Sequence, residues 1–220
     1  MTPNRHPSEA ILAAYAAGSL TEGLALVTAT HLSLCASCRS ANSAIEAIGG
    51  AVFDSLPGEA MREDALAHAL ARIERPDPAG PSEAGLAAPP NGLAELSATP
   101  APLRHYLGGR GWRGWVPGLA AMRIMPRDQE GGSVFLVRVS PGMALAHHGH
   151  GGRELSLILS GAYRDEFGRF GPGDLAEIDE TMCHRPVAEA GAPCICVIAT
   201  ERPLRFTGRL ARALQPMLGL

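Results

Sequence analysis

The sequence predicts an α+β protein of two parts: a small bundle of about four helices held together by zinc, followed by an all-β sandwich or barrel. Three observations support this division. Apolar residues recur at helical spacing as far as residue 75, and short β-branched runs separated by Gly and Pro begin near residue 103. Each part also carries its own set of His, Cys or Glu residues at spacings typical of metal ligands.

The 220 residues are enough for two modest domains, and a hydrophobic content of 46% is sufficient for each to bury a core. The formal net charge of −3 lacks the basic excess typical of direct nucleic-acid binding. No apolar run approaches the roughly 20 residues that cross a bilayer, and the N-terminus lacks the pattern of a signal peptide. We therefore expect a cytoplasmic protein that contacts neither nucleic acid nor membrane, and whose five cysteines form no structural disulfides.

Four helices are predicted in the first part, from apolar residues at i, i+3 and i+4 and from capping residues. They are Ser8–Ala17, a segment that follows Thr21 and includes His31, Cys35–Phe53, and Glu59–Glu74. Pro7 suits a first helical position, which would leave His6 at the cap of the first helix. Four short helices around one metal cannot easily bury every apolar face internally, so the pattern also indicates a partner surface.

Between Pro76 and Pro102 the composition changes to Pro, Ala and Gly, with few large apolar residues. Such a segment buries too little apolar surface to order itself and is typical of a linker. We place the boundaries so that residues 1–85 form the zinc-binding helical domain, 86–102 a Pro- and Ala-rich linker, and 103–220 the β domain with a C-terminal tail.

Short strands separated by Gly- and Pro-bearing turns fill the last part, a pattern typical of a sandwich or barrel. The predicted strands are Ala120–Met125, Val134–Val139, Glu154–Leu159, Ala162–Glu166, Leu175–Ile178, Cys183–Val187 and Cys194–Thr200. The final segment, 208–220, is predicted to be helical or frayed.

The first metal-ligand set is His31-x3-Cys35-x2-Cys38, whose offsets place the three side chains on one helix face or at one helix junction. His6, from the preceding segment, would complete a tetrahedral zinc shell. A redox CxxC pair or plain buried cysteines are the alternative. The histidine four residues before Cys35 disfavours that alternative, because redox CxxC motifs usually follow a strand in a βαβ unit.

The second set is His148, His150, Glu154 and His184. Alternate residues of a strand face the same side, so His148 and His150 point together, while Glu154 returns after a Gly-rich turn and His184 comes from a later strand. Three imidazoles and one carboxylate suit Zn, Fe, Mn or Ni, and spacing alone does not choose among these metals.

The spacing Gly142-x5-His148-x-His150-x3-Glu154-x6-Gly161 matches the first motif of the cupin family. The second cupin motif is degraded, and only Gly173 and His184 remain of it. The resemblance implies a jelly-roll barrel with a metal in its interior, with His184 as the fourth ligand.

The helical zinc motif joined to this cupin motif resembles the ChrR-type zinc-binding anti-sigma factors across essentially the whole chain. The resemblance implies that the N-terminal domain holds an extracytoplasmic-function (group IV) sigma factor in a 1:1 complex. It implies that the cupin domain is needed to release that factor in response to singlet oxygen or organic hydroperoxides. It also implies Zn²⁺ in both sites and no catalytic residues.

Two alternatives to this function stay open from the residues alone. The first is a cupin metalloenzyme, such as a dioxygenase or isomerase, with a zinc-stapled accessory domain. The second, a zinc-dependent DNA-binding regulator, is disfavoured by the net negative charge. Cys194 and Cys196 share one strand face and are interpreted as small buried side chains in preference to an oxidant-sensing thiol pair, and Cys183 stays ambiguous.

Overall fold

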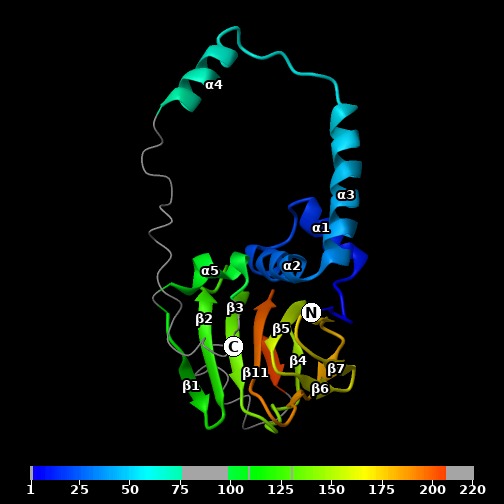
Figure 1. Cartoon of the computed structure of the whole chain (residues 1–220), viewed down its shortest axis with the longest axis vertical. Coiled ribbons are helices and arrows are strands. Elements are labelled where there is room, and N and C mark those ends of the chain that lie inside the picture. The colour runs from blue at the N-terminus through cyan, green and yellow to red at the C-terminus, as the bar shows by residue number, and fades with distance from the viewer. Residues whose placement is uncertain (1, 76–98, 109, 130, 207–220) are drawn as a thin grey trace.

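The computed structural model describes residues 2–75, 99–108, 110–129 and 131–206, in a helical N-terminal part and a β-rich C-terminal part (Figure 1). This arrangement confirms the predicted two-part α+β fold. The predicted tail at 208–220 and most of the predicted linker lie outside the described residues. Within the described ranges, no helix combines the length and apolar character that a membrane crossing needs.

The N-terminal part contains α1 (Glu9–Ala16), α2 (Glu22–Leu34), α3 (Ala36–Asp54) and α4 (Ala65–Glu74). Ser8 caps α1, because its hydroxyl oxygen accepts the Ile11 N–H at 3.3 Å. The prediction that His6 occupies the cap was therefore wrong: His6 lies in the extended segment before it. Cys35 has extended backbone angles and separates α2 from α3, so the cysteine motif sits at a helix junction.

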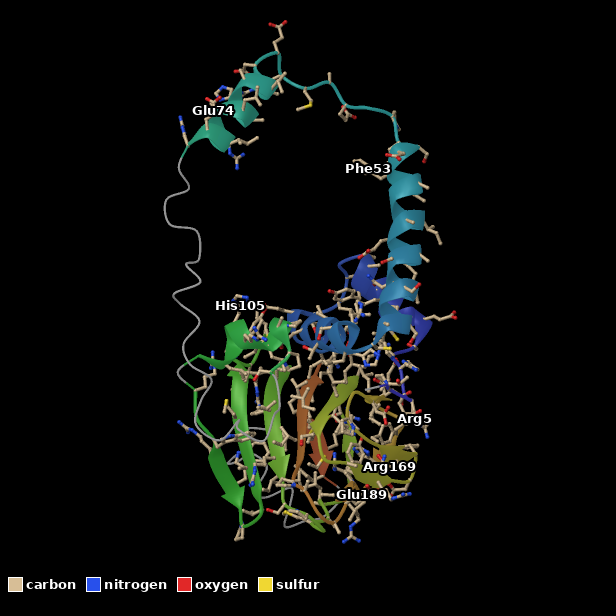
Figure 2. All side chains as sticks on the ribbon, viewed as in Figure 1. Arg5, Phe53, Glu74, His105, Arg169 and Glu189 are labelled. Atoms are coloured by element: carbon tan, nitrogen blue, oxygen red, sulfur yellow. The ribbon has the colours of Figure 1, made fainter. Side chains whose placement is uncertain are left out.

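Helices α1, α2 and the first turns of α3 pack together, whereas the rest of α3 and all of α4 lie away from them (Figure 1). No residue of α4 is buried, and α4 begins at Ala65, later than the predicted Glu59. The side chains at Phe53 and Glu74 lie far from the β domain (Figure 2). The predicted four-helix bundle is thus three helices plus a detached fourth, because the apolar face of α4 finds no partner within the described chain.

The C-terminal part begins with a helix, α5 (Ala101–Leu107), where the sequence predicts the end of the linker and the first strand-like residues. Its strands are β1 (Arg113–Val116), β2 (Leu119–Met125), β3 (Ser133–Val139), β4 (His148–His150), β5 (Glu154–Ser160), β6 (Tyr163–Asp165), β7 (Gly168–Phe170), β8 (Leu175–Ile178), β9 (Cys183–His184), β10 (Val187–Ala188), β11 (Cys194–Thr200) and β12 (Leu204–Phe206). The predicted strand Cys183–Val187 is two strands. Pro186, which has no N–H to donate to a ladder, lies between them.

One six-stranded sheet, in the order β1-β2-β3-β11-β5-β8, faces two three-stranded sheets, β10-β6-β7 and β12-β4-β9. Its central pairs are antiparallel, with Val197 opposite Leu136 on one side and Leu157 on the other. The strands β4 and β9, which carry the candidate histidines, belong to one of the smaller sheets.

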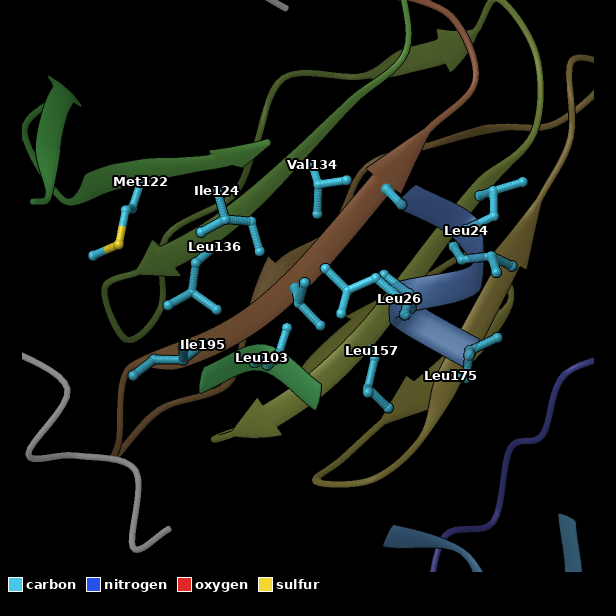
Figure 3. Close-up of a cluster of buried hydrophobic side chains, with 14 of the residues drawn as sticks. Leu24, Leu26, Leu103, Met122, Ile124, Val134, Leu136, Leu157, Leu175 and Ile195 are labelled. Atoms are coloured by element: carbon cyan, nitrogen blue, oxygen red, sulfur yellow. The ribbon is translucent and has the colours of Figure 1, made fainter. Parts of the chain in front are cut away.

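Apart from its exposed edge strand β1, the six-stranded sheet is covered on both faces. Its inner face lines the barrel interior, and its outer face packs against α2 and α5 in one apolar cluster (Figure 3). Leu24 and Val27 of α2 join Leu103 of α5 and Leu136 of β3 in this cluster, and all four side chains are buried. The helical part and the β domain therefore share a core, so α2 is also a structural element of the barrel wall.

Candidate metal centres

The N-terminal candidate site draws its side chains from three local segments. His6 precedes α1, His31 lies near the end of α2, Cys35 is at the junction, and Cys38 is in the first turn of α3. Their potential ligand atoms all lie within 4.8 Å of one another, and His6 is the one exposed member. The structure thus brings together all four residues that the sequence predicts for this site.

The interatomic distances in this cluster fit a single tetrahedral ion. Cys38 Sγ lies 3.3 Å from both His31 Nε2 and His6 Nδ1, and Cys35 Sγ lies 3.5 Å from His6 Nδ1. A tetrahedral zinc with Zn–S of about 2.3 Å and Zn–N of about 2.0 Å would separate sulfur from nitrogen by about 3.5 Å. The donor set, two sulfurs and two imidazole nitrogens, is the set typical of structural zinc.

Burial controls the protonation of these donors. It lowers the pKa of His31 to about 4, which keeps the imidazole in the neutral form that binds metals. Burial also raises the pKa of the Cys38 thiol to about 11, so a metal must displace its proton. At Cys35 burial acts in the same direction, but hydrogen bonds involving Ser37 and Cys38 outweigh it and lower the pKa of that thiol.

The second candidate site lies in the barrel, where β4 pairs antiparallel with β9 and places His148 opposite His184. The imidazoles of His148, His150 and His184 are all buried, and their ligand atoms lie within 4.8 Å of one another. His148 Nε2 and His184 Nε2 are 3.1 Å apart. Two nitrogens bound to one tetrahedral ion at about 2.0 Å would lie about 3.3 Å apart, so the pair fits a shared metal.

The outer nitrogens of two of these imidazoles are already engaged. His148 Nδ1 lies 2.8 Å from the Ala146 carbonyl oxygen, and His184 Nδ1 lies 2.9 Å from Asp165 Oδ2. Both acceptors favour a proton on Nδ1, which leaves the Nε2 lone pairs directed at the cluster. Neither ring nitrogen of buried His150 has a hydrogen-bond partner among the described residues, and a metal would satisfy one of them.

Glu154, at the start of β5, stands beside the three imidazoles and is not part of the mutually close group. Its Oε2 lies 3.3 Å from His150 Nδ1 without hydrogen-bond geometry, and its Oε1 accepts the Ser156 hydroxyl at 3.0 Å. Burial acts to raise the pKa of this carboxyl, but the neighbouring imidazoles, His150 foremost, outweigh it and lower the pKa to about 2. The ionised group faces the cluster, and its role as a ligand stays a prediction.

Sequence reasoning missed the residues that support these sites from outside. Gly173, identified from the sequence only as a remnant of the second cupin motif, contacts His31 through its carbonyl oxygen. Asp174 accepts the N–H groups of Asn4 and Arg5, next to His6, and Asp165 of β6 contacts His184. Cys194 and Cys196 are buried on β11, in agreement with their interpretation as small buried side chains. Cys183, whose role the sequence left ambiguous, is exposed.

Comparison with known proteins shows which family this chain resembles. Residues 108–203 match the family model described as the ChrR Cupin-like domain. The anti-sigma-E factor ChrR of Cereibacter sphaeroides is 41% identical over 224 residues, which cover 98% of each chain. A solved structure of Rhodobacter sphaeroides SigE in complex with the anti-sigma ChrR is similar with a TM-score of 0.72 at 37% identity, covering 91% of this chain and 99% of that one.

Proposed function

Because this chain belongs to the ChrR family of anti-sigma factors, we propose that it sequesters an extracytoplasmic-function (group IV) sigma factor in a 1:1 complex. Members of this family are regulators, which confirms the prediction that the chain is not an enzyme. The cupin metalloenzyme alternative is therefore set aside. The named partner of the similar solved structure, SigE, indicates the kind of sigma factor to test.

The observation that carries this proposal is the apolar surface of α3 and α4. Large hydrophobic side chains that are exposed among the described residues gather between positions 48 and 73: Ile48, Val52, Phe53, Leu56, Met61, Leu66, Leu70 and Ile73, against three others, Val116, Phe167 and Val187. Large apolar side chains left exposed in such number mark a protein interface. On α4, positions 66, 70 and 73 share one face, the spacing by which an amphipathic helix anchors to a groove.

The N-terminal zinc would act on this surface indirectly. An ion held by His6, His31, Cys35 and Cys38 would join the segment before α1 to the α2–α3 junction and so fix the direction in which α3 leaves the bundle. Since α3 carries part of the exposed apolar surface, the direction of α3 determines whether that surface matches the sigma factor.

The cupin domain would govern release. We take singlet oxygen or organic hydroperoxides as the signal and Zn²⁺ as the occupant of the second site, with His148, His150, Glu154 and His184 as its ligands. Oxidant chemistry at or near that metal would change the barrel, and α2 offers a direct route to the sigma-binding part because it packs on the barrel wall. This regulation would take place in the cytoplasm.

The binding proposal is tested by mixing the purified chain with the extracytoplasmic-function sigma factor of the same organism. We expect a 1:1 complex by size-exclusion chromatography with light scattering, and loss of sigma-dependent transcription in a reconstituted assay. Separate elution of the two proteins, with transcription unaffected, would contradict the proposal.

The release proposal needs a cellular readout. We expect a sigma-dependent reporter to rise when cells that express the intact chain meet an organic hydroperoxide or singlet oxygen. The His148→Ala and His184→Ala variants should keep the reporter repressed under the same treatment. His105→Ala, at an exposed histidine of α5 that belongs to neither candidate site, should respond as the unmodified chain does. Normal induction in the two barrel variants would exclude the second site from signalling.

A further inference from the structure

A cavity of about 270 Å³ lies inside the barrel, between the six-stranded sheet and the two smaller sheets. Phe135 and Val137 of β3 and Ile198 of β11 form part of one wall, and Leu204 and Phe206 of β12 form part of another. The polar side chains among its lining residues are those of Ser133, His148, Glu154, Ser156, Tyr163, His184 and Thr200. The cavity is therefore an apolar chamber with a metal-binding group in its wall.

The size of the cavity suits a compact ligand. An apolar cavity of about 150 Å³ is large enough to bind benzene, and pockets for drug-sized molecules begin near 300 Å³. Val116, which is 45% exposed, and Ala146, which is also exposed, belong to the lining, so the chamber reaches the protein surface and a ligand could enter.

Two features of the cavity wall indicate which polar group such a ligand would carry. A zinc ion with three imidazoles and one carboxylate would carry a net charge of about +1, and the buried Asp165 carboxylate, 2.9 Å from His184 Nδ1, would bring the whole group to about zero. Zinc can still take a fifth ligand, and a single carboxylate supplies such an oxygen donor while adding only one negative charge. In addition, Tyr163 is 6% exposed and lines the cavity, and none of the hydrogen bonds found among the described residues involves its hydroxyl. A hydroxyl that borders the cavity is available to donate to an acceptor on a ligand.

From these features we propose that the barrel binds a small monocarboxylate with a hydrocarbon body, its carboxylate at the metal and Tyr163 and its chain among the apolar walls. A more highly charged anion would leave charge in the apolar chamber, and a hydrocarbon without a head group would leave the Tyr163 hydroxyl unsatisfied. The binding rests on a metal in the barrel and not on the sigma factor, so failure here and failure of the anti-sigma proposal are distinguishable.

Trp115 lines the cavity and provides the readout, because an occupying ligand changes its surroundings. The chain has two tryptophans, and Trp112→Phe leaves Trp115 as the sole reporter. This replacement also removes an indole N–H that is buried without a partner, so it should be tolerated. The zinc-loaded variant is titrated with straight-chain monocarboxylates from butanoate to dodecanoate, with fluorescence and calorimetry as parallel measurements.

We expect saturable 1:1 binding that strengthens about fourfold per added methylene until the chain fills the cavity, and weakens beyond that length. Removing the metal, or replacing octanoate with octan-1-ol, should weaken binding about tenfold or more. Equal binding of octanoate to the metal-free protein, equal binding of octan-1-ol, or no saturable binding of any member would each overturn the proposal.

Two variants localise the ligand. Ala188→Leu adds carbon atoms to the lining and should weaken octanoate about tenfold or more, and Tyr163→Phe should weaken it while sparing octane. Val197→Ile, on the face of the six-stranded sheet that packs against α2 and α5, away from the cavity, is the control for nonspecific repacking and should leave the affinity unchanged. Octanoate affinity unchanged by Ala188→Leu, with the fold intact by circular dichroism, would place the ligand elsewhere and overturn the proposal.

Discussion

His31 Nδ1, in the N-terminal metal cluster, lies 3.0 Å from the carbonyl oxygen of Gly173, in the turn before β8 of the barrel. The contact joins residues 142 positions apart and is buried. Because a carbonyl accepts only, it fixes the proton on Nδ1 and leaves Nε2 free to face the Cys38 sulfur. The barrel therefore sets the tautomer and orientation of a candidate ligand in the helical N-terminal part.

Asp174, the next residue, fastens the N-terminal segment to the same turn. Its buried carboxylate accepts the backbone N–H groups of Asn4 at 2.6 Å, Arg5 at 3.0 Å and Gly171 at 2.8 Å. Gly173 has φ +88°, and a Cβ there would lie 2.9 Å from Pro3 Cγ. Since His6 follows Arg5 directly, this turn positions both histidines of the N-terminal site.

Replacing Asp174 with Asn tests this connection. The variant loses the negative charge that accepts three N–H groups and should lower the free energy of unfolding by about 1–3 kcal/mol. We also expect weaker zinc binding at the N-terminal site, measured by competition with a chromophoric chelator after His148 and His184 are replaced to remove the barrel site. Asp128→Asn, in the turn where Asp128 accepts the Gly132 N–H, is the matched control and should leave that zinc affinity unchanged. Equal zinc affinity in the two variants would show that the turn does not position the ligands.

Substitutions in the N-terminal candidate site should abolish sigma binding, whereas a substitution in the barrel site should not. Cys38→Ser or His31→Ala should abolish the complex, because the metal no longer fixes the α2–α3 junction. His148→Ala should leave the complex intact, since that residue lies in the barrel. Surface plasmon resonance with immobilised sigma factor gives the dissociation constants. Retained tight binding by Cys38→Ser, with zinc content confirmed as reduced, would contradict the proposed role of the N-terminal site.

The exposed face of α3 should contribute directly to the partner interface. Val52→Glu places a charge in the apolar surface and should weaken sigma binding about tenfold or more, with little effect on stability, because Val52 is 58% exposed. Ser43 precedes Val52 by nine residues and faces the opposite side of the helix. Ser43→Glu is thus the matched control. Equal weakening by both variants would point to a general charge effect instead of a docking face.

Acid should destabilise the metal-free protein in a defined window. The pKa values of His31 and His148 are about 4 in the fold against 6.5 in the unfolded chain, so the unfolded state binds more protons between these pH values. The free energy of unfolding should therefore fall by more than about 1 kcal/mol as the pH drops from 6.5 to 4. Glu154, with a pKa lowered to about 2 from 4.5, adds a further loss below pH 4.5.

Urea unfolding of the chelator-treated protein at a series of pH values measures this loss. Zinc competes with protons for the same nitrogens, so the zinc-loaded protein should keep its stability to lower pH. A free energy of unfolding that stays level between pH 6.5 and 4 in the metal-free protein would show that these imidazoles are not held neutral by burial.

Local chemistry made much of the molecule predictable. The candidate ligands His31, Cys35 and Cys38 lie within two helical turns of one another, and His148 and His150 lie on one face of one strand, so their spacing alone groups them. The helix positions followed from apolar periodicity, and β11, for which the sequence predicted Cys194–Thr200, has those same bounds. The start of α4 and the helix α5 were missed, because Pro- and Gly-rich flanks leave short helices with weak local signals.

What the sequence by itself determined is therefore the two-part fold and the identity of the candidate ligands, since both depend on residues near one another in the chain. Only the tertiary structure decided that α2 covers the barrel, that Gly173 holds His31, and that α4 stands without a partner. Contacts between residues more than a hundred positions apart depend on how all the surfaces compete for burial at once. No local pattern encodes the outcome of that competition.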